Sequence, residues 1–476
     1  MTPPPRITPE QVAIAMNDFP SRFSPMLVKE LRQGMRTNLF VVAFILLQAV
    51  MILTLMIGLA DPGSSAVGAF FWFFIVTTLL IVQPLRGMNA LSSEIQLNTM
   101  DLIQLTRLDG WRLTLGKWTA LNAQTLLLVT GVLPYLVIRY FLGNVNFVRD
   151  LVDLLMLTLG SGLASAITIG CSVFRNLLLR GVILMGFGMG LTTLFAALKS
   201  SGFRTGIIGS DFWMLGLVCI SLLYGCFFFL SFGASRISPL SENLATRKRL
   251  VALGLTLVTA GFAISGFTQE VLIISGLILG FAVIDALTEP LPIYARVLEP
   301  FRKNPMTRLA ALFLAPGWMS GIGFFFLCAL VWGAILYFGG ILASATAGSW
   351  HFEMAKMTFF LSMCNVLIFP LIFIHLFFGR QASVNFTFGF YAFIQACLLM
   401  LTLMATVLAN TIPKYEDLIF VAVPIPSVLI SGLADGAADD LIHLLIALAT
   451  TLLAAAIPLV RHQKDLREFR HHLKST

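Results

Sequence analysis

Charged residues are scarce in this sequence of 476 residues. Asp, Glu, Lys and Arg together make up 11% of it, against about 25% in an average soluble domain, while hydrophobic residues make up 58%. The deficit of charge extends along the chain apart from short polar islands, which leaves no room for a large soluble domain. The composition therefore excludes a water-soluble fold and predicts an all-α, polytopic integral membrane protein.

Clustered metal-binding or catalytic residues are also missing. The six cysteines all lie inside apolar runs and form no Cys-x-x-Cys pair; they are Cys171, Cys219, Cys226, Cys328, Cys364 and Cys397. This pattern predicts small packing residues rather than disulfides or a metal site. His462, His471 and His472 lie in the polar tail, where we expect them to be solvated, and no Ser/His/Asp set or carboxylate pair suggests a shared site.

Long apolar runs are the feature that the sequence has in abundance. A helix needs about 20 apolar residues to cross the hydrocarbon layer. Twelve runs meet this length: 39–60, 65–84, 119–142, 151–173, 177–197, 211–232, 249–268, 271–288, 318–345, 355–378, 388–410 and 441–460. The shorter tract 418–433 is broken by Pro424 and Pro426, so we interpret it as a re-entrant or interfacial hairpin.

The distribution of Lys and Arg predicts the orientation of these spans. Of the 31 basic residues, 25 lie in segments on the amino-terminal side, five lie on the opposite side, and Arg139 lies within a span. Basic residues resist translocation, so both termini are expected in the cytoplasm. The net charge of +8 then follows from topology and requires no nucleic-acid partner. The polar segment before residue 39 is too long for a cleaved signal peptide, which predicts that the first span is a retained anchor.

The segment 24–36, SPMLVKELRQGMR, predicts an amphipathic helix before the first span. Ser24 suits the cap and Pro25 the first helical position, and apolar residues recur at helical spacing. The other face carries polar residues that include Lys29, Glu30, Arg32 and Arg36. We expect this helix to lie in the membrane interface. The alternative is an ordinary basic flank of a membrane anchor.

The loop 85–118 is longer than a connection between neighbouring helices requires, so we expect it to be folded. Asn98 and Asp101 resemble a capping box, and Met100, Ile103 and Arg107 share one face of the predicted helix. We expect Asp109 and Gly110 to form a turn. Trp111 and Trp118 would then mark the membrane interface, with Arg112 and Lys117 on its aqueous side.

The order of these elements resembles the permease subunit of type-2 ABC exporters, a class that includes drug, polysaccharide and sodium exporters. The resemblance covers roughly residues 24–145 and depends on VKELRQGMR, SSEIQLNTMDLIQLTRLDG and the Leu-Gly-Lys before the third span. It implies a bacterial plasma-membrane location and a coupling helix that docks on a separate ATPase subunit. By position, the residues facing the ATPase would be Asn98, Thr99, Met100, Asp101, Ile103, Gln104 and Arg107, flanked by Lys29, Glu30, Arg32 and Arg36.

The chain itself has no ATP-binding motif, so we expect it not to be an enzyme. The nearest look-alike, Gly110 to Lys117, has five residues between its glycines where a phosphate-binding loop has four, and Trp118 replaces the Ser or Thr that binds magnesium. No cofactor is therefore expected in this chain, and ATP and magnesium would bind the partner subunit.

Three segments follow from this organisation: a cytoplasmic segment 1–38, a first six-span half 39–232, and a second half 233–476 with the re-entrant tract and a basic tail. In the second half, 237–250 precedes a span as 24–36 does, and 289–317 occupies the place of the coupling loop. The segment 198–210 is too short for an equivalent re-entrant pair. One chain with two ATPase subunits, two copies of this chain, and a pairing with a different permease all remain open.

Two other functions remain open besides export of a hydrophobic or amphipathic substrate. An ion-coupled secondary transporter requires buried carboxylates near broken helices. The deepest carboxylate in the predicted spans is Asp285, and its place near a span end predicts a solvated or capped residue. A membrane scaffold without transport activity requires hydrophobicity alone.

Overall fold

The structure is a computed structural model, and it describes residues 25–60, 65–96, 109–142, 146–174, 180–181, 211–238, 242–265, 268–290, 295–347, 354–377, 384–411 and 441–474. All regular elements within these ranges are helices. The predicted all-α fold is therefore confirmed for the part of the chain that the structure describes.

Nine helical segments within these ranges are long and apolar enough to cross a membrane: Asn38–Ala60, Val67–Asn89, Gly110–Phe141, Phe147–Cys171, Leu215–Ile237, Glu270–Thr288, Trp318–Gly339, Phe360–Phe377 and Leu444–Arg461. Each of them matches one of the twelve predicted spans. The protein is an all-α polytopic membrane protein.

The other three predicted spans are not among these nine, and the total of twelve stays a prediction. Helix α12 (Leu244–Gly261) occupies the place of the seventh span, but its first turns carry Arg247, Lys248 and Arg249. Helix α19 (Val384–Thr411) occupies the place of the eleventh, with a shorter apolar stretch at Phe386–Leu398. The predicted fifth span falls almost entirely outside the described residues, and the tract 418–433 does so completely.

The chain divides into two compact units. Unit 1 comprises Met1–Arg180 and Gly225–Ser238, and unit 2 comprises Gly181–Tyr224 and Pro239–Thr476. Helix α11 (Asp211–Ile237) contributes residues to both. The predicted halves 39–232 and 233–476 stay predictions.

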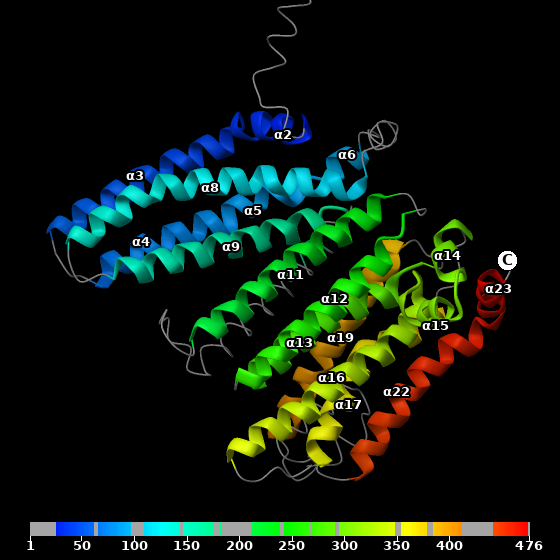
Figure 1. The fold of residues 1–476 in the computed structure, drawn as a ribbon. Coiled ribbons are helices and arrows are strands. Elements are labelled where there is room, and N and C mark those ends of the chain that lie inside the picture. The colour runs from blue at the N-terminus through cyan, green and yellow to red at the C-terminus, as the bar shows by residue number, and fades with distance from the viewer. Residues whose placement is uncertain are drawn as a thin grey trace, which may run out of the picture. The chain divides into compact units, whose positions relative to one another are not determined.

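Unit 1 is built around the long helix α8 (Gly110–Leu142), which packs against α2 (Pro25–Met35), α3 (Asn38–Ala60) and α9 (Phe147–Cys171) (Figure 1). Its second span is a continuous run of short helices: α4 (Ser65–Thr77), a π-helical turn η1 (Thr78–Val82), α5 (Gln83–Leu85) and a 3₁₀ turn η2 (Arg86–Asn89). The short helix α6 (Ser92–Gln96) follows, and it lies near α2 at the end of the bundle where α8 begins (Figure 1).

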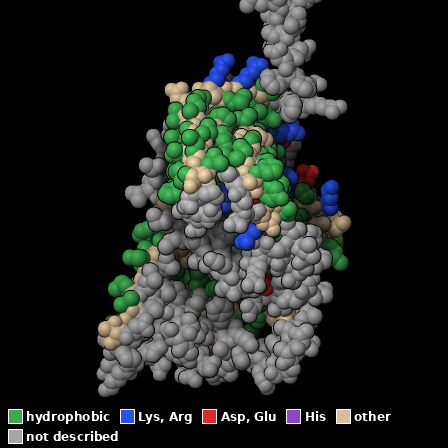
Figure 2. All heavy atoms as spheres, turned by 90° about the vertical axis from the view of Figure 1, so that its left-hand side faces the viewer, with side chains coloured by type: hydrophobic (Ala, Val, Ile, Leu, Met, Phe, Trp, Pro, Cys, Tyr) green, Lys and Arg blue, Asp and Glu red, His purple; other side chains and the backbone are tan. Residues whose placement is uncertain are grey.

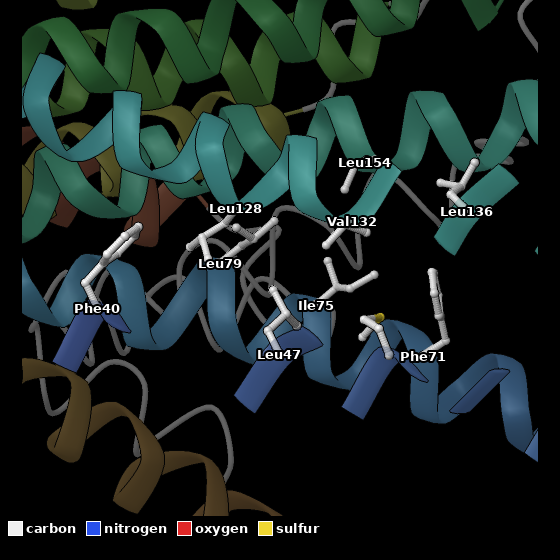
Figure 3. Packing of buried hydrophobic residues seen from close by; sticks show 10 residues of the cluster. Phe40, Leu47, Phe71, Ile75, Leu79, Leu128, Val132, Leu136 and Leu154 are labelled. Atoms are coloured by element: carbon white, nitrogen blue, oxygen red, sulfur yellow. The ribbon is translucent and has the colours of Figure 1, made fainter. Parts of the chain in front are cut away.

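The core of unit 1 consists of apolar side chains from α3, the second span, α8 and α9 (Figure 3). Met51 and Ile75 are completely buried there, and Leu128 packs among them. Because lipid is as apolar as these side chains, van der Waals packing holds them together more than expulsion of water does. Close backbone approach contributes as well: a Cβ added to Gly170 would lie 2.6 Å from the Phe229 carbonyl oxygen.

Unit 2 packs α13 (Thr268–Thr288) against α16 (Trp318–Ala347) and α12, and it packs α22 (Leu441–Arg461) against α17 (Met354–Ile368) and α18 (Pro370–Phe377). A 3₁₀ turn, η3 (Phe262–Ser265), follows α12. Three short helices, α14 (Ala295–Arg302), α15 (Pro305–Leu314) and α23 (Gln463–Lys474), gather at the end of this unit where α16 begins (Figure 1).

The spans expose large apolar side chains on their outer faces, as contact with lipid requires. On α3 these include Val42, Ile45 and Met56. Figure 2 shows hydrophobic side chains gathered over the upper, described part of one face, with Lys and Arg side chains along its top edge. Surfaces of this kind mark membrane contact when they are this extensive.

Candidate functional site

The amphipathic helix predicted at 24–36 is present as α2, Pro25–Met35. Lys29, Arg32 and Arg36 are exposed, whereas Glu30 is partly buried. Their proposed place beside an ATPase stays a prediction. The structure shows that Glu30 attaches this helix to the spans through an ion pair with Lys117.

A buried ammonium group joins α2 and α6 to α8. Lys117 on α8 is 6% exposed, and its Nζ lies 3.0 Å from Glu30 Oε1 and 3.2 Å from Glu94 Oε1. Lys117 is therefore buried among helices of unit 1, and its predicted place on the aqueous side of the interface stays a prediction. The two carboxylates come from α2, which precedes the first span, and from α6, which follows the second. Both are partly desolvated, and the Lys117 ammonium group provides the counter-charge that each of them needs.

A guanidinium group holds the connection between α2 and α3. Arg86 donates to the Gly34 carbonyl oxygen at 2.7 Å and to Thr37 Oγ1 at 3.1 Å, and it also donates to Gln124 Oε1. The last carbonyls of a helix have no partner within it, and a cation at that end is favoured by the helix dipole. Arg86 thus caps α2 from the second span.

The tryptophans predicted to mark the interface lie against other helices of unit 1. Trp118 Nε1 donates to the Gly162 carbonyl oxygen on α9 at 2.9 Å, and the Trp111 ring lies 5.6 Å from that of Phe227. The predicted turn at Asp109–Gly110 is the beginning of α8, where the Asp109 carbonyl oxygen accepts a bond from Leu113 N. Arg112 is exposed and lies 3.6 Å from Asp109 Oδ2.

A second buried network lies in unit 2 and joins α12 to the end of α13. Lys248 Nζ contacts Asp285 Oδ2 and lies 3.2 Å from Glu289 Oε1, and Arg249 Nη2 lies 2.8 Å from Glu289 Oε2. Asp285 is 3% exposed. The prediction that Asp285 is solvated or simply capped is therefore wrong: it is buried in an ion pair.

Arg249 also holds the connector between α15 and α16. Its Nη1 donates to the carbonyl oxygens of Phe313 at 3.0 Å and Ala315 at 2.6 Å, and its Nη2 donates to that of Gly317 at 3.2 Å. Gly317 has a φ of 114°, a conformation that favours glycine, so the chain turns sharply here. The turn leaves these carbonyl oxygens without helical hydrogen-bond donors, and Arg249 provides the missing donors.

Glu289, which directly follows the α13 span, is held in its ionised form. Burial raises the pKa of its carboxyl, but the charges of Lys248 and Arg249, with hydrogen bonds from Lys248 and the Gly317 N–H, outweigh this effect and lower the pKa below the usual value. A carboxylate with a lowered pKa does not exchange protons near neutral pH. The network thus has the properties of a structural joint between helix ends.

The tail histidine His462 is not solvated, which corrects the prediction made for it. Its Nε2 lies 3.3 Å from His375 Nδ1, and its Nδ1 lies 3.1 Å from Asp465 Oδ2. The Trp318 ring lies 4.2 Å from the His375 ring, so this cluster joins α16, α18 and the junction of α22 with α23. No group of three or more His, Cys, Asp or Glu residues arranged to hold a metal ion is found among the described residues.

The predicted ATPase-facing residues lie outside the residues that the structure describes: Asn98, Thr99, Met100, Asp101, Ile103, Gln104 and Arg107. The described chain stops at Gln96 and resumes at Asp109. Glu94, two residues before this gap, belongs to the Lys117 network. The structure therefore describes where the loop is attached, and the role of the loop stays a prediction.

Comparisons of the chain with protein-family models, with curated proteins and with solved structures found no match.

The two networks follow one plan. In unit 1, Lys117 and Arg86 join the segment before the first span to the end of the second and the start of the third. In unit 2, Arg249 at the start of α12 contacts Glu289 after α13 and the connector before α16. In each unit, ion pairs and hydrogen bonds from buried cations connect three neighbouring helix ends, which we expect to move as one rigid block. Such a block can transmit a displacement of its polar segments to the spans.

Proposed function

We propose that this chain is the permease subunit of an ATP-driven ABC exporter, moved by a separate ATPase. Its spans change between inward-open and outward-open arrangements when the ATPase subunits close on ATP and displace the polar segments at one end of the bundle. Both termini lie in the cytoplasm, and the membrane is the bacterial plasma membrane. The substrate is hydrophobic or amphipathic, in keeping with the apolar spans.

The Lys117 network is the observation that carries this proposal. A lever requires a rigid attachment, and Lys117 attaches both α2 and α6 to α8 through buried ion pairs. The segment 97–108, which resembles a coupling helix, directly follows α6. A partner that displaces this segment would also displace α8, the third span, because the Lys117 ion pairs connect them. Separating these pairs would leave desolvated ions without a counter-charge, which is energetically costly.

An ion-coupled secondary transporter is the second candidate, and one observation favours it. Asp285 and Glu289 are buried carboxylates, as ion coupling requires. Asp285 is paired with Lys248, and Glu289 is paired with Lys248 and with Arg249, which also holds the α15–α16 connector. The pKa of Glu289 is lowered. These features favour a fixed joint over a site that loads and releases a cation.

Reversing charge in the predicted coupling helix should uncouple the ATPase. The variant carries Asp101→Lys and Arg107→Glu, which leaves the net charge unchanged. We expect the substrate-stimulated ATP hydrolysis of the co-purified complex to fall about tenfold or more, because reversed charges at a docked interface cost several kcal/mol.

The matched control is Arg149→Glu with Asp153→Lys, two residues at the start of α9. This control reverses the same number of charges, but on the side of the membrane predicted to be external. Full hydrolysis in the control and a tenfold loss in the variant support the proposal. Equal hydrolysis and equal ATPase retention in both variants would remove the coupling-helix assignment.

A further inference from the structure

Helix α15 exposes an apolar face. Met306 is 83% exposed, Leu309 60% and Leu312 44%, and their spacing of three residues places them on one side of the helix. Ala311 on the opposite side is completely buried. This helix packs against α16, and the side chains of Met306, Leu309 and Leu312 face away from that contact. The arrangement requires something apolar to cover the outer face.

The attachment of α15 fixes it where a span begins. Only residues 315–317 separate its last residue from Trp318, the first residue of α16. Arg249 holds this connector, and Thr246 Oγ1 donates to the Leu314 carbonyl oxygen at 2.8 Å. Helix α15 is therefore held at the level where α16 passes from water into lipid.

Helix α23, at the same end of unit 2, has a different surface. Helix α23 buries Phe469 and exposes Lys464, Arg467 and Glu468, and it packs against α14. Its outer face is charged and suits water. The apolar face of α15 is therefore not shared by α23, its neighbour at this end of the unit.

Charge at the edge of the apolar face indicates which apolar surface covers it. Lys303 and Arg308 are exposed beside it. Between Met306 and Leu312, the outer face offers no hydrogen-bonding side chain apart from Arg308, whereas protein interfaces carry about one hydrogen bond per 100–200 Å². An apolar stripe with basic residues at its border suits a membrane with anionic headgroups.

We propose that α15 lies in the surface of the bilayer, with Met306, Leu309 and Leu312 among the acyl chains and with Lys303 and Arg308 on the phosphate groups of anionic phospholipids. This inference goes beyond the proposed function and does not depend on it. It also has a consequence for the predicted second coupling loop at 289–317, because α15 would be occupied by lipid and would not offer its face to an ATPase.

Quenching by brominated lipid tests the depth of α15. The six native cysteines are replaced by alanine, Leu309→Cys is introduced and labelled with an environment-sensitive fluorophore, and the protein is reconstituted in vesicles of phosphatidylcholine and phosphatidylglycerol with brominated acyl chains. We expect the fluorescence at position 309 to fall at least about twofold, since the probe enters the acyl region. The matched control, Arg467→Cys on the charged face of α23, should be quenched little. Equal quenching at both positions, or quenching at 309 only after a soluble partner is removed, would overturn the proposal.

A second variant tests the headgroup contact without disturbing the apolar face. Lys303→Glu with Arg308→Glu should lower the number of phosphatidylglycerol molecules that native mass spectrometry finds retained on the detergent-solubilised protein. Lys464→Glu with Arg467→Glu is the control, with the same change of charge on α23. If both variants retain as much phosphatidylglycerol as the unmodified chain, the assignment of Lys303 and Arg308 to headgroups is wrong.

Discussion

Replacing Arg249 with methionine should lower the free energy of unfolding by about 3–5 kcal/mol, the cost of breaking a buried ion pair by removing one partner. Methionine occupies a similar volume but carries no charge, so Glu289 would lose one of its two cations and remain buried. The carbonyl oxygens of Phe313, Ala315 and Gly317 would lose a common donor. Both losses affect the connector before α16, so we expect α15 to separate from α16 before the rest of unit 2 unfolds.

Thermal and denaturant unfolding of the detergent-solubilised variant measures this effect. The control is Arg112→Met, which removes the same side chain from an exposed ion pair at 3.6 Å and should change stability by less than about 0.5 kcal/mol. A variant that yields no folded protein agrees with the prediction provided that Arg249→Lys, which keeps the charge, gives an intermediate yield. Similar stability of Arg249→Met and Arg112→Met would show that the network contributes nothing.

Replacing Lys117 with methionine should release α2 from the spans. Glu30 and Glu94 would then face each other without the cation between them. Their side chains remain 19% and 16% exposed, so the expected cost is about 2 kcal/mol, below the range for completely buried pairs. That energy corresponds to roughly 30-fold faster exchange of amide hydrogens in α2, since exchange from a locally opened state follows its free energy.

Hydrogen exchange followed by mass spectrometry provides the measurement, with α13 as the internal reference. Lys117→Arg should keep α2 protected because it retains the positive charge. Unchanged protection of α2 in Lys117→Met would mean that Arg86 and apolar packing hold this helix without the ion pairs. The variant should also lose substrate-stimulated ATP hydrolysis while it still retains the ATPase.

Spans and the first amphipathic helix were predictable because local physical constraints determine them. A run of apolar residues long enough to cross a bilayer has few other stable structures, and each of the nine candidate spans in the described residues lies at a predicted run. Pro25 and the helical spacing of apolar residues placed α2 at 24–36, and the structure has it at Pro25–Met35. These features require no knowledge of distant partners.

The buried networks were missed because their partners are far apart in the sequence. Lys117 and Lys248 count among the basic residues that orient a membrane protein, and the rule for orientation does not indicate which of these residues is buried. One signal was available: Asp285 and Glu289 are four residues apart, on one face of the end of a span, and the basic run 247–249 begins the preceding helix. Two antiparallel helices joined by a short turn bring these ends together.

The second half also differs from the prediction that 237–250 parallels 24–36. In unit 1, Thr37 separates α2 from α3, whereas α12 continues from Leu244 to Gly261 without a break. Asn243 Oδ1 accepts a bond from Thr246 N at 3.2 Å and caps the helix there. Lys248 and Arg249 in the first turns of α12 pair with Asp285 and Glu289, so the described residues 244–250 belong to α12 rather than to a separate surface helix.

Site-specific photo-crosslinking tests the central claim most directly. A photoreactive amino acid is placed at Gln104, in the predicted coupling helix, and separately at Asp435, in the segment predicted to lie outside, and whole cells are irradiated before purification. We expect position 104 to be crosslinked to a protein with a phosphate-binding loop, and we expect no such crosslink from position 435. Crosslinks from position 104 to lipid or to this chain alone, with no ATPase captured, would contradict the assignment of the chain as an ATP-driven permease.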